Sequence, residues 1–258
     1  MADRPLPILR GVTLAYEDVW RVLGVMRTVM LYALLIVLAF KVIDNIGLSR
    51  AMNGGLTGTV LGFAIAAAQS FCLTPIMIAI HRFIILDEVT TAYAVDPSGP
   101  SFIAFFGWWM ALSLLIPLVI AVSALLQVFG FSAGAAIGPT MMVTIVVIIL
   151  LLRLAILFPA IAVGVRGATA GDALADSKGH VFAIFLIFAL ALLPLTAISL
   201  GITSMLGRDI MSRRTPAALT GLVLDSVIQV TSLVLCVAIA SRIFQAIGNR
   251  LRMPGPAR

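Results

Sequence analysis

The sequence predicts an all-α integral membrane protein with six transmembrane helices. Apolar residues make up 62% of the 258 residues and charged residues only 11%, with a mean hydropathy of +1.16. A soluble domain carries about 25% charged residues, which keep its surface hydrated. This chain has too few to do so, and its apolar residues form runs long enough to cross a bilayer. A soluble enzyme, a disordered chain and a secreted disulfide scaffold are therefore excluded.

Six apolar segments have about the 20 residues or more that a helix needs to cross a bilayer. They cover residues 25–45, 57–81, 102–128, 133–153, 181–206 and 217–241. Inside lipid, every backbone polar group must find a partner within the protein, which favours helices over open strands. The period-two alternation of a membrane β-barrel is absent from these segments. The transmembrane domain is therefore expected to cover residues 25–245.

Residues 1–24 are expected to form an amphipathic lead-in on the cytoplasmic side, without the apolar core of a cleavable signal peptide. A helix with 3.6 residues per turn would have one apolar and one charged face here. The apolar face contains Ile8, Val12, Val19, Leu23 and Met26, and the charged face contains Arg10, Glu17, Asp18 and Arg21. At the other end of the chain, residues 246–258 form a basic cytoplasmic tail.

The segments between and within the spans carry helix and turn signals. Pro117 and Pro194 lie near the middle of the third and fifth spans, where each removes a backbone hydrogen bond and favours a kink. Residues 96–100 have the composition of a turn. Before the fifth span, Thr169 can cap a short helix, with an acid three residues later and Gly179 at the far end.

The distribution of positive charge predicts that both termini lie in the cytoplasm. An even number of spans places the two termini on the same side. Twelve of the 17 Lys and Arg residues fall on that side and five on the other, and positive residues are retained on the cytoplasmic side. Membrane orientation therefore accounts for the net charge of +6. Nucleic acid is not an expected partner, because no Lys/Arg tract with interleaved aromatic residues is present.

The six spans divide into three helical hairpins with similar ends. Each even-numbered span ends in an arginine that is followed by a short apolar segment; these are Arg82, Arg153 and Arg242. The guanidinium groups are expected to act as interfacial anchors that reach the lipid headgroups, with the apolar segments lying in the interface. The hairpins are either repeats of one unit or alike by chance, because arginine is common at the ends of membrane helices.

Small residues recur at every fourth position of the second span, at Gly54, Gly58, Gly62 and Ala66. Such a stripe allows two helices to approach closely inside a membrane. We expect it to pack within the six-helix bundle. The alternative is that it forms the contact of a homo-oligomer.

Asp225, Gln229 and Ser232 share one face of the sixth span and form a candidate intramembrane polar site. An acid inside a membrane is costly and therefore indicates a functional site. Asp225 could hold a proton or a cation, or pair with a buried basic group. It could also hydrogen-bond to another helix or reach outer water, which is the interpretation we favour. Arg153 is expected at the opposite, cytoplasmic end of the bundle, too far away to pair with it.

No motif indicates an enzyme, a cofactor or a metal ion. The sequence lacks a phosphate-binding loop, a GxSxG nucleophile turn and an HExxH zinc motif. Cys72 and Cys236 lie within apolar runs and outside any CxxC motif. His81 and His180 are expected at the cytoplasmic interface and lack the spacing of metal ligands. The connections between spans are too short for a soluble catalytic domain.

Residues 153–163, followed by residues 171–180, resemble a group of bacterial inner-membrane proteins. The shared layout is a span that ends in arginine, an apolar stretch with Pro159-Ala160, a short Ala-rich helix and then Gly179. Residues 81–84 are similar to an earlier counterpart of the first stretch. The group includes the membrane domain that is fused to some glycerophosphodiester phosphodiesterases, and its stand-alone relatives. The resemblance implies a bacterial inner-membrane protein without an assigned reaction, because the catalytic domain of the fused members is not present in this sequence.

These patterns predict a non-enzymatic accessory or membrane-organising protein. Its expected partners are the lipid bilayer and either a second copy of the chain or another membrane protein. The alternative function is that of a small transporter or lipid-handling protein. The stripe of small residues favours the first function, whereas Asp225 and the two mid-span prolines favour the second.

Overall fold

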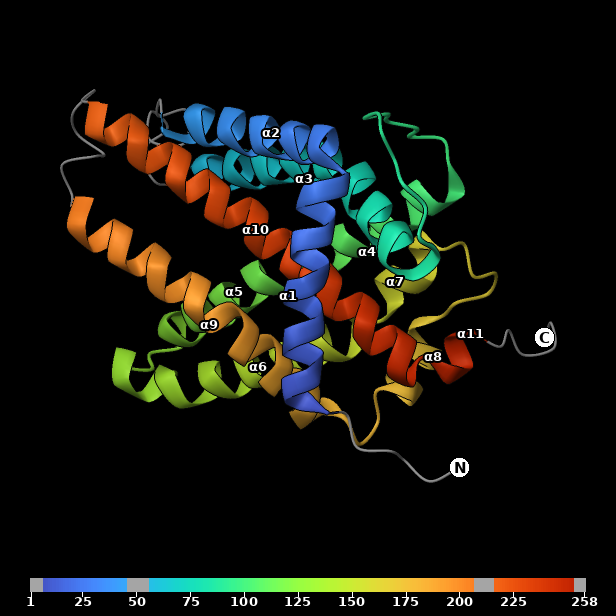
Figure 1. Ribbon diagram of the computed structural model, residues 1–258. Coiled ribbons are helices and arrows are strands. Elements are labelled where there is room, and N and C mark those ends of the chain that lie inside the picture. The colour runs from blue at the N-terminus through green and yellow to red at the C-terminus, as the bar shows by residue number, and fades with distance from the viewer. Residues whose placement is uncertain (1–6, 46–55, 207–215, 253–258) are drawn as a thin grey trace.

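The computed structural model describes residues 7–45, 56–206 and 216–252, and the regular structure within these ranges is entirely helical (Figure 1). The helices are α1 (Ile8–Val25), α2 (Arg27–Asn45), α3 (Leu56–Leu86), α4 (Pro100–Ser113), α5 (Leu115–Val128), α6 (Ala133–Leu154), α7 (Leu157–Ala162), α8 (Ala170–Asp176), α9 (Val181–Leu206), α10 (Pro216–Ile247) and α11 (Asn249–Arg252). The predicted all-α fold is confirmed.

Within the described ranges, five segments are long and apolar enough to cross a membrane. They are Val60–Leu86, Pro100–Val128, Gly134–Ala162, Val181–Ile202 and Leu219–Ile247. The first predicted span, residues 25–45, corresponds to α2, and it passes as a span only when α1 and α2 are counted together. The protein is therefore a multi-pass membrane protein with five or six spans. Two helices run beyond their predicted ends, α3 to Leu86 and α10 to Ile247, because the apolar segments after Arg82 and Arg242 continue the helix.

Helix α10 is the central helix of the bundle. In the most apolar 18-residue stretch of α10, 39% is buried inside the protein. The corresponding share is 6% for the segment formed by α4 and α5. It packs against α1, α2, α3, α7 and α9. Helices α5 and α6 pack mainly on each other and leave large apolar side chains exposed, among them Ile116, Ile120, Met142 and Val146. Such a surface fits a lipid environment, which does not penalise exposed apolar side chains.

Helix α1 lies across the bundle rather than along it. The chain bends by 98° between α1 and α2, at Met26, and α1 crosses α9 and α10 (Figure 1). Its inner face buries Ala15, Asp18, Val19 and Val22, whereas Trp20 points outward. The predicted charged face is therefore wrong for Asp18, because this carboxylate lies on the packed face.

The turn predicted at residues 96–100 and the cap predicted at Thr169 are confirmed. The two mid-span prolines, Pro117 and Pro194, differ in their effect on the helix. Thr169 Oγ accepts a hydrogen bond of 3.1 Å from the backbone N–H of Asp172, and Gly179 has a φ of +84°. Helices α4 and α5 separate at Leu114, because Pro117 has no N–H for the carbonyl four residues earlier. Helix α9, in contrast, continues through Pro194.

The loop between α3 and α4 is fastened to the bundle by Tyr93. Its hydroxyl donates a 2.9 Å hydrogen bond to the carbonyl of Cys72, and its ring stacks on Tyr32 with 5.4 Å between centroids. Burial raises the pKa of Tyr93 above its ordinary value, which keeps the phenol protonated as a donor.

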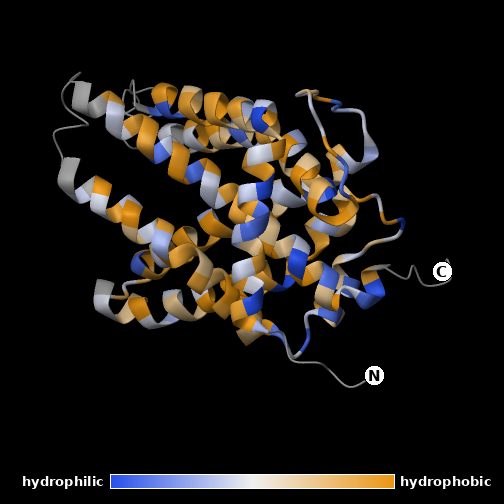
Figure 2. Ribbon diagram, viewed as in Figure 1, coloured by the Kyte–Doolittle hydropathy of each residue, from blue (hydrophilic) through white to orange (hydrophobic). Residues whose placement is uncertain are grey.

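Polar residues concentrate at one end of the molecule. Figure 2 shows apolar residues along most of the helices, and hydrophilic residues on α1 and around α8 and α11. Asp176 at the end of α8 accepts hydrogen bonds from the backbone N–H groups of Arg250 and Leu251, at 2.9 and 3.1 Å. The first part of the predicted basic tail is thereby tied to the bundle.

Candidate functional site

A polar cavity of about 310 Å³ lies between α2, α9 and α10. Its lining residues are Lys41, Leu195, Thr196, Ser199, Asp225, Ile228, Gln229 and Ser232. The structure thus brings the three predicted polar residues of the sixth span, Asp225, Gln229 and Ser232, together in one cavity. They share it with polar residues from two other helices.

Helical periodicity explains why these side chains converge. Asp225, Gln229 and Ser232 are spaced by four and three residues, so they lie along one face of α10. Thr196 and Ser199 are likewise three residues apart on α9. Lys41 reaches the same cavity from the last turns of α2. Helices α9 and α10 thus each contribute a polar strip, and Lys41 of α2 joins them in the same cavity.

An ion pair occupies the centre of the cavity lining. Lys41 Nζ donates to Asp225 Oδ2, and Ser199 Oγ lies 3.5 Å from Asp225 Oδ1, at the limit of hydrogen-bond distance. The Lys41 and Asp225 side chains are 20% and 46% exposed. The structure supports two of the roles considered for Asp225: it pairs with a basic group, and through Ser199 it lies within hydrogen-bond distance of another helix. That basic group is Lys41 and not Arg153.

The sequence pattern contained a signal for this pair. Lys41 lies four residues before the end of α2, or about 6 Å at 1.5 Å per residue. Asp225 lies six residues after the start of the span at Leu219, or about 9 Å. The two helix ends lie on the same predicted side of the membrane, so the charges are at similar depths. Sequence reasoning treated Lys41 as an outer-end residue and did not consider it.

The pair makes the cavity neutral overall and rich in both donors and acceptors. The ammonium supplies donors and the carboxylate supplies acceptors, while Gln229 offers both. A second cation would have to compete with Lys41 for the carboxylate. The arrangement therefore fits a neutral or zwitterionic polar group better than a bare cation.

Arg242, predicted to be an interfacial anchor, forms an ion pair with the buried carboxylate of Asp18 on α1. Its Nε and Nη2 donate to the two carboxylate oxygens of Asp18 at 2.6 and 2.7 Å, and Nη1 donates to Gln245 at 3.0 Å. The Asp18 side chain is 1% exposed. A two-pronged pair of this kind fixes both distance and orientation, so it holds the crosswise helix α1 on α10.

Arg82 and Arg153 also bind protein groups. Arg82 Nε and Nη2 donate to Glu88 at 2.7 and 2.6 Å, and its Nη1 donates to the carbonyl of Ala162 at 3.1 Å. Arg153 donates to Ser177 Oγ at 3.2 Å and to the carbonyl of Leu174. The prediction that these arginines reach lipid headgroups missed these contacts, because sequence spacing did not reveal their partners.

The three arginines follow one pattern of contacts, which supports the threefold repeat. Arg82 contacts the segment before α4, Arg153 contacts α8 before α9, and Arg242 contacts α1 before α2. The apolar residues after them are buried in the protein rather than in the interface; these are Phe83, Leu157 and Phe244. Each hairpin end is therefore joined to the entry of a hairpin by an arginine, which binds a carboxylate at Arg82 and Arg242 and neutral oxygens at Arg153.

The stripe of small residues is open where it can be assessed. Gly54 lies outside the described residues, and Gly58 is half-buried. A Cβ atom added at Gly62 would meet nothing within 4 Å, and Ala66 is exposed. Within the described ranges, the expected close packing is not seen at these two positions, although Gly62, like Gly58, is half-buried.

Comparisons with known proteins found no match, so a functional proposal has to rest on the geometry of the site. No family model matches the chain, and no significant match was found among the curated proteins or the solved structures. Within the described residues, no group of three or more His, Cys, Asp or Glu residues could hold a metal ion.

Proposed function

We propose that this protein binds a polar or amphipathic ligand in the cavity between α2, α9 and α10, as a small transporter or a lipid-handling protein. One observation carries the proposal: the Lys41–Asp225 pair lies in a cavity of about 310 Å³ with the polar side chains of Thr196, Ser199, Gln229 and Ser232. This function fits the geometry better than a purely structural role for the polar face.

The physical cost of charge in a membrane supports this choice. Ionisable groups within spans are rare and generally face a partner or a water-filled cavity. A pair that served packing alone would be closed off by other side chains. Here nearly half of the Asp225 side chain is exposed, and the exposed part adjoins the cavity. Water or the polar part of a ligand can therefore contact the charges directly.

The chemistry of the lining indicates the class of ligand. A neutral cavity with adjacent positive and negative groups suits a zwitterionic or uncharged polar group that accepts from Lys41 and donates to Asp225. Either a lipid headgroup or a small polar solute can present such a group. A lipid would remain in the bilayer when bound, whereas a solute would have to enter from water.

We place the protein in a bacterial inner membrane with both termini in the cytoplasm. The excess of Lys and Arg on one side supports this orientation. The cavity would then lie in the outer half of the bilayer, since the ends of α2 and the start of α10 fall on the opposite side from the termini.

Native mass spectrometry of the protein in nanodiscs formed from its own membrane tests the proposal. We expect wild type to retain one lipid or solute species, and Asp225→Asn and Lys41→Met to retain at least tenfold less. Glu17→Gln is the matched control, because Glu17 is exposed on α1 and far from the cavity. The mass of the retained species distinguishes a lipid from a solute. Equal retention by all four proteins would contradict the proposal.

A second candidate function is that of an accessory or membrane-organising protein. The open surface at Gly62 and Ala66 favours it, because small residues on an uncovered helix allow another membrane helix to approach closely. The partner would be a second copy of the chain or another membrane protein. Disulfide trapping of Ala66→Cys in native membranes, with Cys72 and Cys236 replaced by alanine, should then give one defined cross-linked species. A chain that remains uncross-linked would contradict a contact between two copies of the chain at this position.

A further inference from the structure

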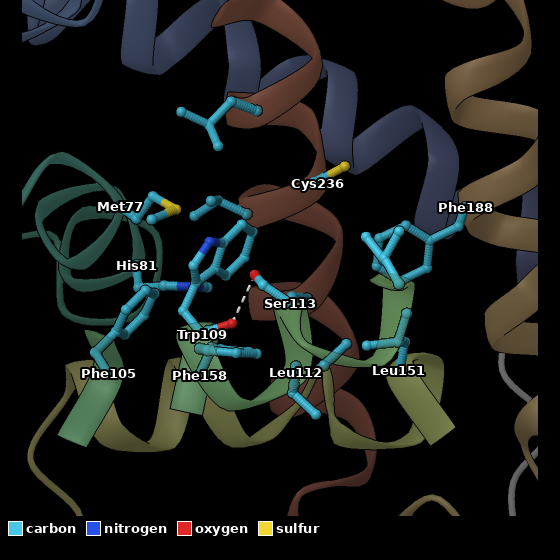
Figure 3. Close-up of a pocket in the computed structure, with 15 residues that line it drawn as sticks. Met77, His81, Phe105, Trp109, Leu112, Ser113, Leu151, Phe158, Phe188 and Cys236 are labelled. Atoms are coloured by element: carbon cyan, nitrogen blue, oxygen red, sulfur yellow. Dashed lines mark hydrogen bonds between the residues drawn. The ribbon is translucent and has the colours of Figure 1, made fainter. Parts of the chain in front are cut away.

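A second cavity, of about 280 Å³, lies among α3, α4, α7, α9 and α10. Its lining is mainly apolar and aromatic, and includes Met77, Phe105, Trp109, Phe158, Phe188 and Leu233. The aromatic side chains support one another: Phe158 lies 4.9 Å from Phe105 and 5.6 Å from Trp109, measured between ring centroids. Figure 3 shows these rings around the cavity, with His81 among them.

His81 is a buried polar residue in this apolar wall. It was expected at the membrane interface, but its side chain is packed inside the bundle and the residue is 1% exposed. Its Nδ1 lies 2.7 Å from Ser241 Oγ on α10. None of the described residues that line the cavity has a charged side chain, so the uncharged imidazole is the form that suits this site.

The hydrogen bonds around Ser241 assign the positions of the protons on His81. Ser241 Oγ donates to the carbonyl of Val237 at 2.8 Å. A hydroxyl has a single proton to donate, so with that proton on the Val237 carbonyl, Ser241 Oγ accepts from His81. Nδ1 therefore carries the imidazole proton, and Nε2 carries a lone pair that can only accept a hydrogen bond.

This lone pair has no donor among the residues that the structure describes. Two strong donors of the lining are committed elsewhere, because Trp109 Nε1 donates to Ser70 at 3.2 Å and Ser113 Oγ donates to a backbone carbonyl at 2.8 Å. The free thiol of Cys236 also lines the cavity and is only a weak donor. Buried acceptors are normally paired, so a lone acceptor in a cavity wall points to a donor supplied from outside the chain.

We propose that this cavity binds an uncharged, ring-bearing apolar alcohol or phenol, whose hydroxyl donates to His81 Nε2. The aromatic walls contact the ring system, and the single acceptor fixes its orientation. An apolar pocket with one convergent polar group is the usual form of a site for such a ligand. This site is separate from the polar cavity at Lys41 and does not depend on the function proposed for it.

A matched pair of ligands tests this inference on the wild-type protein. The probes are 2-naphthol and 2-methoxynaphthalene, which share a ring system but differ in the proton of the hydroxyl. Binding to the full-length protein in nanodiscs is measured by calorimetry, with empty nanodiscs correcting for partition into lipid. We expect 2-naphthol to bind one site at least tenfold more tightly than the ether. Equal affinities in wild type would overturn the inference.

Variants locate the binding. In His81→Phe the preference for 2-naphthol should disappear, and in Ala240→Phe, which narrows the cavity, both probes should lose binding. Asp225→Asn should leave both affinities unchanged. The chain has two histidines, so imidazole ¹⁵N spectra can follow His81 directly, and 2-naphthol should shift its Nε2 signal. An unchanged preference in His81→Phe, or an unmoved Nε2 signal on saturation, would also overturn the inference.

Discussion

The ion pair between Asp18 and Arg242 should respond unequally to the loss of each partner. The Asp18 side chain is 1% exposed, whereas that of Arg242 is 27% exposed. Replacing Arg242 with methionine leaves a buried carboxylate without its main partner. Replacing Asp18 with asparagine leaves a partly exposed guanidinium that keeps its 3.0 Å hydrogen bond to Gln245. The arginine variant should therefore be the less stable of the two.

The magnitudes follow from the burial of each group. Breaking a buried ion pair costs about 3–5 kcal/mol when an unpaired charge is left behind. Arg21 lies 3.6 Å from Asp18 and is itself half-exposed, so it would recover about 1 kcal/mol or less. We expect Arg242→Met to lower the free energy of unfolding by about 3–4 kcal/mol. Asp18→Asn should cost about 1–2 kcal/mol, because the neutral amide can still accept a hydrogen bond.

Equilibrium unfolding by denaturant in detergent micelles, followed by tryptophan fluorescence, measures both losses. Arg10→Met is the matched control, because it makes the same chemical change at an exposed position of α1, and it should shift stability by about 0.5 kcal/mol or less. The double variant Asp18→Leu with Arg242→Leu removes both charges and should be more stable than Arg242→Met. If Asp18→Asn cost as much as Arg242→Met, the argument from unequal burial would be refuted.

Three further predictions concern the Lys41–Asp225 pair, two glycines and the cap of α8. A double-mutant cycle of Lys41→Met and Asp225→Asn, measured by unfolding, should give a coupling of about 0.5–3 kcal/mol; no coupling would mean that the two side chains do not pair. Gly248→Ala should lower the free energy of unfolding by about 1–3 kcal/mol, since the new Cβ would lie 2.6 Å from the carbonyl oxygen of Phe244. Gly62→Ala, where a Cβ meets nothing within 4 Å, should leave the free energy of unfolding unchanged or raise it by about 1 kcal/mol. Equal effects of the two substitutions would contradict this difference. Thr169→Ala should cost about 1 kcal/mol by removing the cap of α8, seen as faster hydrogen exchange at Asp172; unchanged exchange there would contradict the role of the cap.

The membrane spans could be predicted from sequence because hydropathy is a property of each segment alone. The helix of residues 181–206 was predicted with the bounds that the structure gives for α9. The cap at Thr169 and the turn at residues 96–100 were also predictable, because each is formed by residues only a few positions apart in the sequence. Residues 25–45 were predicted to form a span, but α2 meets the length and hydropathy required of a span only together with α1.

The contacts of the polar residues could not be predicted in this way. Asp18 and Arg242 are 224 residues apart, Lys41 and Asp225 are 184 apart, and His81 and Ser241 are 160 apart. Helical periodicity places a residue on a face but does not say which helix covers that face. Asp18 was therefore assigned to the solvated face of α1, and Arg242 to the lipid headgroups. The predicted site was found in part, since Asp225, Gln229 and Ser232 were identified but Lys41 was missed.

The central claim is that a polar cavity at the Lys41–Asp225 pair is open to water or to a polar ligand inside the membrane protein. Cysteine labelling in membrane vesicles tests it most directly, in a background where Cys72 and Cys236 are replaced by alanine. Ser232→Cys lines the cavity, whereas Val227→Cys is exposed on a different face of α10. The account predicts that a membrane-impermeant maleimide labels Ser232→Cys from one side and leaves Val227→Cys unlabelled. Failure to label Ser232→Cys, or equal labelling at both positions, would contradict it.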